Sequence, residues 1–231
     1  MTLVKSFREN IKIFFAQNLF RFEGISLSKV DTRVLLDQKI MHNLNFDSDQ
    51  TQIIKNVING LDFLEENFDS LSINLDSYKK FQAILANQQA LETGVLRTGN
   101  CYIHCIEEPI EPVSERQVNY VISDLNYLNE FNYKESVPDC FTRLARMQPF
   151  YDGNKRSSLF LCNLALLKKD LGAFFITNEK YPKFEDLLTD FYTGKNKDIL
   201  PFLSDCVYSK QELKLKFSNN SLEHLKNSKS L

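Results

Sequence analysis

The sequence predicts an all-α protein that contains one small β-hairpin. Apolar residues recur at the spacing of helices through most of the 231 residues. Seven glycines and six prolines are too few for a many-turned β fold and suit helices joined by short loops. The 19 Phe and 9 Tyr can fill a sizeable core, and 43% hydrophobic with 25% charged residues is typical of a globular protein.

The N-terminal segment predicts an amphipathic helix over residues 2–23. Gly24 follows it and can take the left-handed conformation that ends many helices. Glu23 lies at the negative end of the helix dipole, where a carboxylate is mildly unfavourable. It is a solvated surface residue, a partner of Arg21 or Lys29, or a partner of a cation elsewhere in the fold. The apolar face of this helix comprises Phe7, Ile11, Phe14, Phe15, Leu19 and Phe22.

Further helices are expected along the chain, with the hairpin between them. The sequence Asp47-Ser48-Asp49 is predicted to cap a long helix, and Ser136 is the predicted N-cap of the helix that ends at Met147. The apolar period changes between 93 and 107, where residues 95–97 and 102–104 flank Gly99-Asn100 and predict the hairpin. The other helices are predicted at about 28–37, 75–92, 114–131, 157–169, 183–192 and 199–209, followed by a polar tail with at most marginal helix over 210–231.

Composition and charge exclude several classes of function. The net charge of −2 provides no global basic field, so nucleic-acid binding is not expected. We expect no signal peptide, and no window reaches the ~18 uncharged apolar residues of a membrane span. Five cysteines without a paired zinc-ligand pattern indicate a reduced, cytoplasmic protein. The cluster Cys101, His104 and Cys105 lacks an evident fourth ligand and is not expected to hold a metal.

Residues 148–158 predict a turn that leads into the N-terminus of a helix. Pro149 cannot continue the preceding helix. The turn sequence Asp152-Gly153-Asn154 follows, in which Asn154 is a good N-cap, and a strongly apolar helix comes next. Such a turn presents unpaired backbone N–H groups and the positive end of a helix dipole, which together favour an anion.

The charged residues of this loop indicate a di- or triphosphate with magnesium. Lys155 and Arg156 are disfavoured in the first turn of a helix unless an anion offsets their charge. Asp152 is placed to hold a Mg²⁺ that bridges phosphate oxygens. The tetrapeptide of residues 152–155 alone would more often be a plain capped turn, and the spacing of a P-loop is absent.

The whole loop resembles the motif of the Fic family, His-Pro-Phe-x-(Asp/Glu)-Gly-Asn-(Gly/Lys)-Arg. Residues 94–99 resemble the family's β-hairpin flap, which aligns the backbone of a target protein. Glu23-Gly24 resembles the inhibitory segment (Ser/Thr)-x-x-x-Glu-Gly, although Leu19 stands where Ser or Thr belongs. The resemblance spans about residues 12–208 and implies one Fic-like domain over 1–209. The matching motif residues are Pro149, Phe150, Asp152, Gly153, Asn154, Lys155 and Arg156.

The resemblance implies transfer of AMP from ATP, with Mg²⁺, to a hydroxyl of a target protein. Related proteins transfer UMP, phosphocholine or phosphate. Partners would be a nucleotide and an unknown target protein, and a homodimer is left open. By resemblance, Asp152 would hold Mg²⁺ and Arg156 would contact the outer phosphates. The α-phosphate would be surrounded by Gly153, Asn154 and Lys155. The target would be bound by Arg97, Thr98 and Gly99, and Glu23 would inhibit the transfer.

Two departures from the motif bear on activity. Gln148 replaces the histidine that serves as general base, and an amide has no useful basicity near neutral pH. Loss of a general base typically costs ~10²–10⁴ in rate. Leu159 replaces a second arginine with which the inhibitory glutamate normally pairs. We therefore expect Glu23 near the loop, with Lys155, Arg156 or no residue as its partner.

Three hypotheses follow from the sequence. The first is a Fic-like nucleotide-binding protein whose transferase activity is lost or strongly reduced. The second is an active transferase that works without histidine, through a water, the substrate's own phosphate or a different donor. His104 on the predicted flap is not expected to replace the base. The third is a non-enzymatic interaction module whose hairpin binds another chain.

Overall fold

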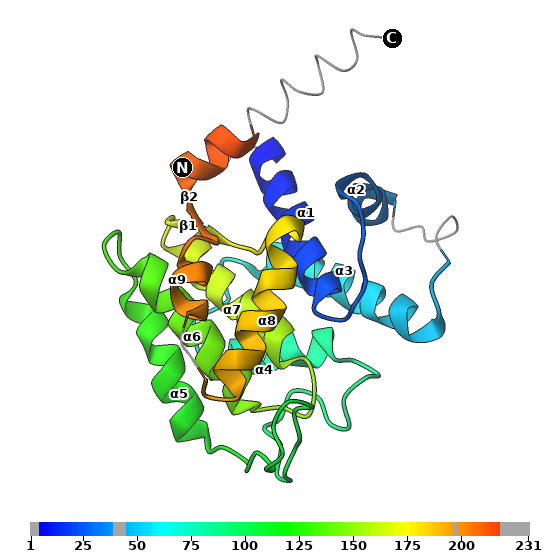
Figure 1. Cartoon of the computed structure of the whole chain (residues 1–231). Helices are drawn as coiled ribbons and strands as arrows, with labels where there is room; N and C mark the ends of the chain where they lie inside the picture. Colours follow the sequence, from blue (N-terminus) through cyan, green and yellow to red (C-terminus); the bar gives the residue numbers. More distant parts are fainter. Residues whose placement is uncertain (1–4, 39–44, 196–197, 218–231) are drawn as a thin grey trace, which may run out of the picture.

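The computed structural model describes residues 5–38, 45–195 and 198–217, and shows a mostly helical domain with one two-stranded antiparallel sheet (Figure 1). The predicted fold class is confirmed. Within the described ranges, no helix combines the length and apolarity that a membrane crossing requires. The elements are α1 (Lys5–Arg21), α2 (Lys29–Gln38), α3 (Ser48–Asn67), α4 (Leu75–Leu85), α5 (Glu115–Ser123), η1 (Asp124–Tyr127), α6 (Tyr133–Met147), α7 (Asn154–Lys168), β1 (Gly172–Phe174), η2 (Asn178–Lys180), α8 (Tyr181–Tyr192), α9 (Ile199–Ser204) and β2 (Val207–Ser209).

Helix α7 lies at the centre of the fold. Twelve of its 15 residues are buried, because it is apolar on nearly every side. It packs against α4, α6 and β1, and the other helices surround it in Figure 1. Residues 148–153 lead directly into this helix, so the position of the motif loop is fixed by the best-packed element of the core.

The end of α1 is also firmly anchored. Gly24 has a φ of 74°, the left-handed conformation predicted for it. The Phe22 ring packs near the rings of Phe141 and Phe184. The Tyr181 hydroxyl donates a hydrogen bond to the carbonyl oxygen of Arg21 at 2.7 Å. The residue between Phe22 and Gly24 therefore has a defined place in the fold. Residues 2–4 of the predicted helix lie outside the described residues.

The predicted hairpin over residues 93–107 does not form. This segment contains no strand, and its ladder contact is an isolated bridge between Cys101 and Ile110. The cause is a competing partner, because the backbone N–H of Arg97 donates to the carbonyl oxygen of Pro149 at 3.0 Å. Residues 95–97 are therefore joined to the motif loop and do not pair with residues 102–104.

The sheet is formed elsewhere, by β1 and β2. Gly172 pairs with Ser209 and Phe174 with Val207. The predicted helix over 199–209 is thus too long, since α9 ends at Ser204 and β2 follows it. A Cβ at Gly172 would lie 1.9 Å from the carbonyl oxygen of Tyr208, so only glycine permits this pairing.

Several helix boundaries differ from those predicted, three of them with a change in the type or extent of an element. Helix α6 begins at Tyr133, three residues before the predicted cap Ser136. The helix predicted over 75–92 ends at Leu85, and the one predicted over 114–131 becomes a 3₁₀ turn after Ser123. These ends carry no strong stop signal in the sequence, and tertiary contacts decide them.

The predicted polar tail over 210–231 is partly wrong. Residues 210–217 are helical, and Leu213 and Phe217 are buried in a small cluster with Ile11, Ala173 and Phe175. The two apolar residues lie four apart, so one helical face carries both into this cluster. Residues 218–231 lie outside the described residues.

Candidate functional site

Gln148 is fixed at both ends of its amide. It follows the last turn of α6 with a left-handed φ of 46°. Its Nε2 donates to the carbonyl oxygen of Ala145 at 2.7 Å, and its Oε1 accepts from Asn154 Nδ2 at 2.7 Å. Its own carbonyl oxygen accepts from Arg97 Nε at 2.5 Å. This side chain therefore holds the loop in shape, and an amide does not take up a proton at neutral pH.

Asn154 closes the loop from inside. Its Oδ1 accepts from the backbone N–H of Phe150 at 2.9 Å, and its Nδ2 donates to the carbonyl oxygen of Phe150 at 2.9 Å. Phe150 is fully buried, with its ring 4.9 Å from that of Tyr78. The predicted packing role of Phe150 agrees with this burial. The predicted N-cap role of Asn154 is wrong, because its side chain points back to Phe150 and Gln148.

The N-terminus of α7 is preceded by Gly153, which has a φ of 77° and no side chain. A Cβ there would lie 3.1 Å from that of Ala86, so the close approach of α4 also favours glycine. No side chain among the described residues caps this helix. The first-turn N–H groups of α7 consequently have no side-chain acceptor and can receive an anion.

Arg156 is fully buried and engaged by protein groups. Its Nη1 donates to the carbonyl oxygen of Leu85 at 2.5 Å and to Gln89 Oε1 at 2.8 Å. Its Nη2 donates to Asp152 Oδ2 at 3.2 Å. The predicted contact with outer phosphates would thus require a change in these partners. In this conformation the Arg156 side chain links the end of α4, the motif loop and the end of α1.

Glu23 is the fourth partner of Arg156, and the predicted closeness of Glu23 to the loop is confirmed. Its Oε1 lies 2.7 Å from Arg156 Nε. The Nε–H does not point along this line, so the contact is an ion pair more than a directed hydrogen bond. Leu159 is fully buried in the core, and Leu19 is also a core residue. The arginine with which Glu23 pairs is therefore Arg156, and Leu159 takes no part in the ion pair.

Burial shifts two pKa values at this junction. It raises the pKa of the Glu23 carboxyl, more than the attraction of Arg156 lowers it, and Asp152 adds to the rise. Burial also lowers the pKa of the Lys155 amine, although Glu23 opposes this shift. The ammonium of Lys155 lies over the Phe22 ring, 5.5 Å from its centre. Carboxylates and cations thus meet in a poorly hydrated place.

Asp152 is the residue that fits Mg²⁺. Its side chain is 41% exposed and lies beside the N-terminus of α7. Its Oδ1 accepts from the N–H of Gly153 at 2.5 Å, so the carboxylate is held in orientation. No group of three or more metal-binding side chains gathers among the described residues. One carboxylate suits Mg²⁺, which is commonly held by one or two carboxylates together with substrate phosphates.

The three predicted flap residues differ in their exposure and contacts. The side chain of Arg97 is buried, and its nitrogens donate to the carbonyl oxygens of Gln148, Gly99 and Glu111 at 2.5–2.7 Å. The prediction that this side chain contacts a target is therefore not supported, and its place is that of a positioning residue. Gly99 donates its N–H to the Tyr151 hydroxyl at 3.0 Å. Thr98 is exposed, as is His104.

Two glutamines support the loop and were missed in the sequence. Gln82 donates its Nε2 to the carbonyl oxygen of Asp152 at 3.0 Å and accepts from the N–H of Gly94 at 2.6 Å. Gln89 binds both Arg156 and Asn56. Isolated glutamines in and after a helix resemble solvated polar residues, so no sequence pattern singles them out.

Comparison with known proteins identifies the fold. The sequence matches no protein-family model and no curated protein. A Fic domain containing signaling protein from Bacteroides thetaiotaomicron is 18% identical, with a TM-score of 0.62 over 91% of this chain and 88% of that one. Fic-1 of C. elegans is 18% identical, with a TM-score of 0.66 over 98% and 68%. A Fic family protein from Desulfovibrio desulfuricans is 15% identical, with a TM-score of 0.64 over 94% and 67%. The chain therefore has a Fic-like fold.

Proposed function

We propose that the loop over residues 148–156 binds the phosphates of a nucleotide, with ATP as the first candidate. The observation that carries the proposal is the N-terminus of α7, which no described side chain caps and beside which Lys155 and Asp152 lie. Backbone N–H groups at a helix N-terminus bind phosphate well. Asp152 would hold Mg²⁺, and the ion would neutralise charge on the phosphates when it is bound. The Fic-like fold supports the same function.

We further propose that transfer of AMP to a protein hydroxyl is weak or absent in this chain. The reaction requires removal of a proton from the attacking hydroxyl, and Gln148 stands where the family's base would be. Both polar ends of its amide are already used by Ala145 and Asn154. Gln148 can help to orient a hydroxyl, but it offers no site for the proton.

Calorimetry with ATP, UTP, GTP and CDP-choline, each with Mg²⁺, tests the binding site. Lys155→Gln is expected to weaken the binding of the preferred ligand about tenfold, because a charge-assisted contact beside the phosphates is lost. Lys169→Gln, beyond the other end of α7, is the matched control and should bind as the starting protein does. Equal affinity of all three proteins would place the ligand elsewhere, and absence of binding even with Glu23→Gln would overturn the proposal.

Glu23→Gln is expected to raise nucleotide affinity about tenfold. The substitution keeps the shape of the side chain but removes a negative charge 2.7 Å from Arg156, so the phosphate site becomes more positive. Calorimetry of the two proteins at neutral pH measures the difference. Glu185→Gln is the control for removing any negative charge near Lys155. Glu185 lies on α8 and also acts on Lys155 through its charge, but it forms no ion pair with Arg156 among the described residues.

The raised pKa of Glu23 provides an internal check. Protonation of Glu23 as the pH falls removes the same charge as the substitution, and it begins above the usual value of 4.5. The ratio of the affinities of Glu23→Gln and the starting protein should therefore decline toward one as the medium is acidified. The ratio cancels the titration of the nucleotide, which is the same for both proteins. A ratio that stays constant would show that the charge of Glu23 does not limit binding.

A further inference from the structure

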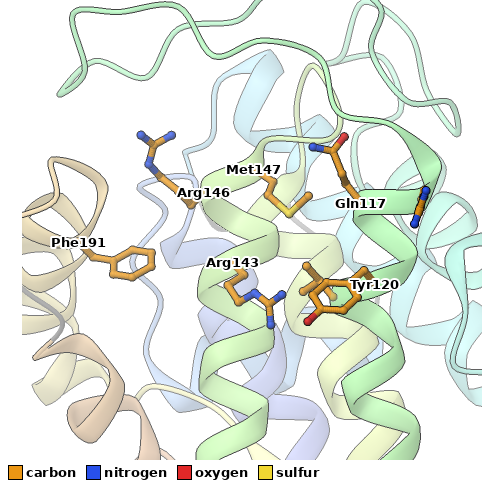
Figure 2. A pocket seen from close by; sticks show the side chains of 8 residues that line it. Gln117, Tyr120, Arg143, Arg146, Met147 and Phe191 are labelled. Atoms are coloured by element: carbon orange, nitrogen blue, oxygen red, sulfur yellow. The ribbon is translucent and has the colours of Figure 1, made fainter.

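A cavity lies beside the C-terminal end of α6, next to the motif loop, and has its own chemistry. It has a volume of about 450 Å³ and is bounded by α5, the end of α6 and the end of α8 (Figure 2). We call it the arginine groove, after Arg116, Arg143 and Arg146, which line it together with Tyr120, Met147 and Phe191. Met147 directly precedes Gln148, so the groove opens next to the loop.

The groove is positively charged, and no carboxylate inside it neutralises this charge. No acidic residue lines it. Arg143 is compensated by Asp124 and Asp139, each at 3.0 Å. Arg116 and Arg146 form no ion pair with a carboxylate among the described residues. Two cations that form no ion pair among the described residues therefore line one groove of a chain whose net charge is −2.

The fold alone does not explain why an arginine stands at position 116. Arg146 lies in the last turn of α6, where a cation is favoured by the helix dipole. Arg116 lies in the first turn of α5, where the dipole disfavours a cation, and the carboxylate of Glu115 in the same turn is engaged by Lys79 at 2.5 Å. It is exposed, so it stabilises no buried group. An anionic occupant of the groove would offset the cost of this arginine.

The walls of the groove are apolar and aromatic. Tyr120 is 70% exposed and lies across from Arg143, whose guanidinium carbon is 5.6 Å from the centre of the ring. Figure 2 shows Tyr120 on the α5 side, with Arg146 and Phe191 on the other side of α6. Exposed aromatic and arginine side chains are the types that anchor protein partners. The occupant should combine acidic groups with an aromatic or long aliphatic side chain.

We propose that the arginine groove docks an acidic segment of the protein that presents its hydroxyl to the motif loop. This inference rests on the proposed function for the identity of the partner. Its physical basis is charge complementarity beside residue 148, which would select targets whose modifiable residue lies near Asp or Glu and an aromatic residue. The acidic segment lies in the groove, and its neighbouring residue reaches Gln148.

The test uses fluorescein-labelled 12-residue peptides of Glu, Ser, Gly and Tyr, and matched peptides with Gln for every Glu. The full chain should bind the Glu peptide about tenfold more tightly at physiological salt. Arg116→Gln combined with Arg146→Gln should remove this preference, as measured by fluorescence anisotropy. Arg33→Gln combined with Lys55→Gln changes the net charge equally on α2 and α3, which lie away from α5 in Figure 1, and should retain it.

Each other outcome is decisive. Equal binding of the Glu and Gln peptides, no binding of either, or equal loss in both double variants would overturn the groove. Tighter binding of a single-stranded oligothymidine that the Glu peptide cannot displace would also overturn it, in favour of a nucleic acid. Calorimetry of nucleotide on the same proteins separates the two proposals, since the groove variants leave residues 148–156 unchanged. Nucleotide binding without acidic preference refutes the groove alone, and acidic preference without nucleotide binding refutes the proposed function.

Discussion

Gln148→His, in a chain that also carries Glu23→Gly, is expected to raise the rate of AMP transfer to protein by about 10²–10⁴, the usual contribution of a general base. A neutral imidazole can keep the bond to the Ala145 carbonyl oxygen through its N–H, while its second nitrogen, no longer bound to Asn154, accepts the proton of the attacking hydroxyl. Histidine also tolerates the left-handed backbone found at this position. Mass spectrometry of AMP attached to the chain itself or to a mixture of candidate proteins measures the gain.

Gln148→Asn with Glu23→Gly is the matched control, because it keeps an amide and adds no base. No product from the histidine variant, with nucleotide bound by calorimetry, would favour a non-enzymatic interaction module. High activity of the unaltered chain would contradict the silencing role of Gln148 and support a transferase that works without histidine. The Glu23→Gly change is included so that the ion pair with Arg156 does not mask the gain.

Arg156→Ala is expected to lower the free energy of unfolding by about 3 kcal/mol, at the lower end of the range for breaking a buried ion pair. The guanidinium is fully buried, and its loss removes the cation that the Leu85 carbonyl, Gln89 and two carboxylates share. The carboxylates are partly exposed, at 22% for Glu23 and 41% for Asp152, so water recovers part of the loss. Urea unfolding followed by circular dichroism measures the change.

Arg143→Ala provides the comparison for this effect. Arg143 also meets two carboxylates, but its side chain is 32% exposed, so its removal should cost less than about 1 kcal/mol. Equal unfolding midpoints for Arg156→Ala and the starting protein would show that the buried network contributes nothing. The expected loss also means that Arg156→Ala is unsuitable as a test of phosphate binding, because a fall in affinity would follow from loosening of the loop.

The predictable parts of the site were those set by local sequence. Gly24 ends α1 because glycine alone adopts its backbone without strain, and this places Glu23 at a fixed point. The turn at Gly153 likewise follows from its own residue type. A Fic-like fold was expected from the motif, and the structural matches agree with it.

The parts that could not be predicted depend on residues far apart in the chain. Arg97 has the appearance of a surface flap residue, and only the fold shows that three carbonyl groups meet at its guanidinium. A hairpin over 93–107 has suitable local signals, but residue 97 finds a better backbone partner at Pro149. The side chain of Asn154 bonds back to Phe150 and does not cap α7, because the shape of the loop brings Phe150 next to it.

The bonds of Arg97 also have a consequence for recognition. The buried side chain of Arg97 joins the segment around residues 97–99 to the carbonyl oxygen of Gln148, and the backbone N–H of Arg97 joins it to that of Pro149. A partner that lies along this segment meets a backbone that is already ordered, so less conformational entropy is lost on association. The segment and the loop form one preorganised unit. The distance between a chain bound along the segment and residue 148 is therefore fixed before the partner binds.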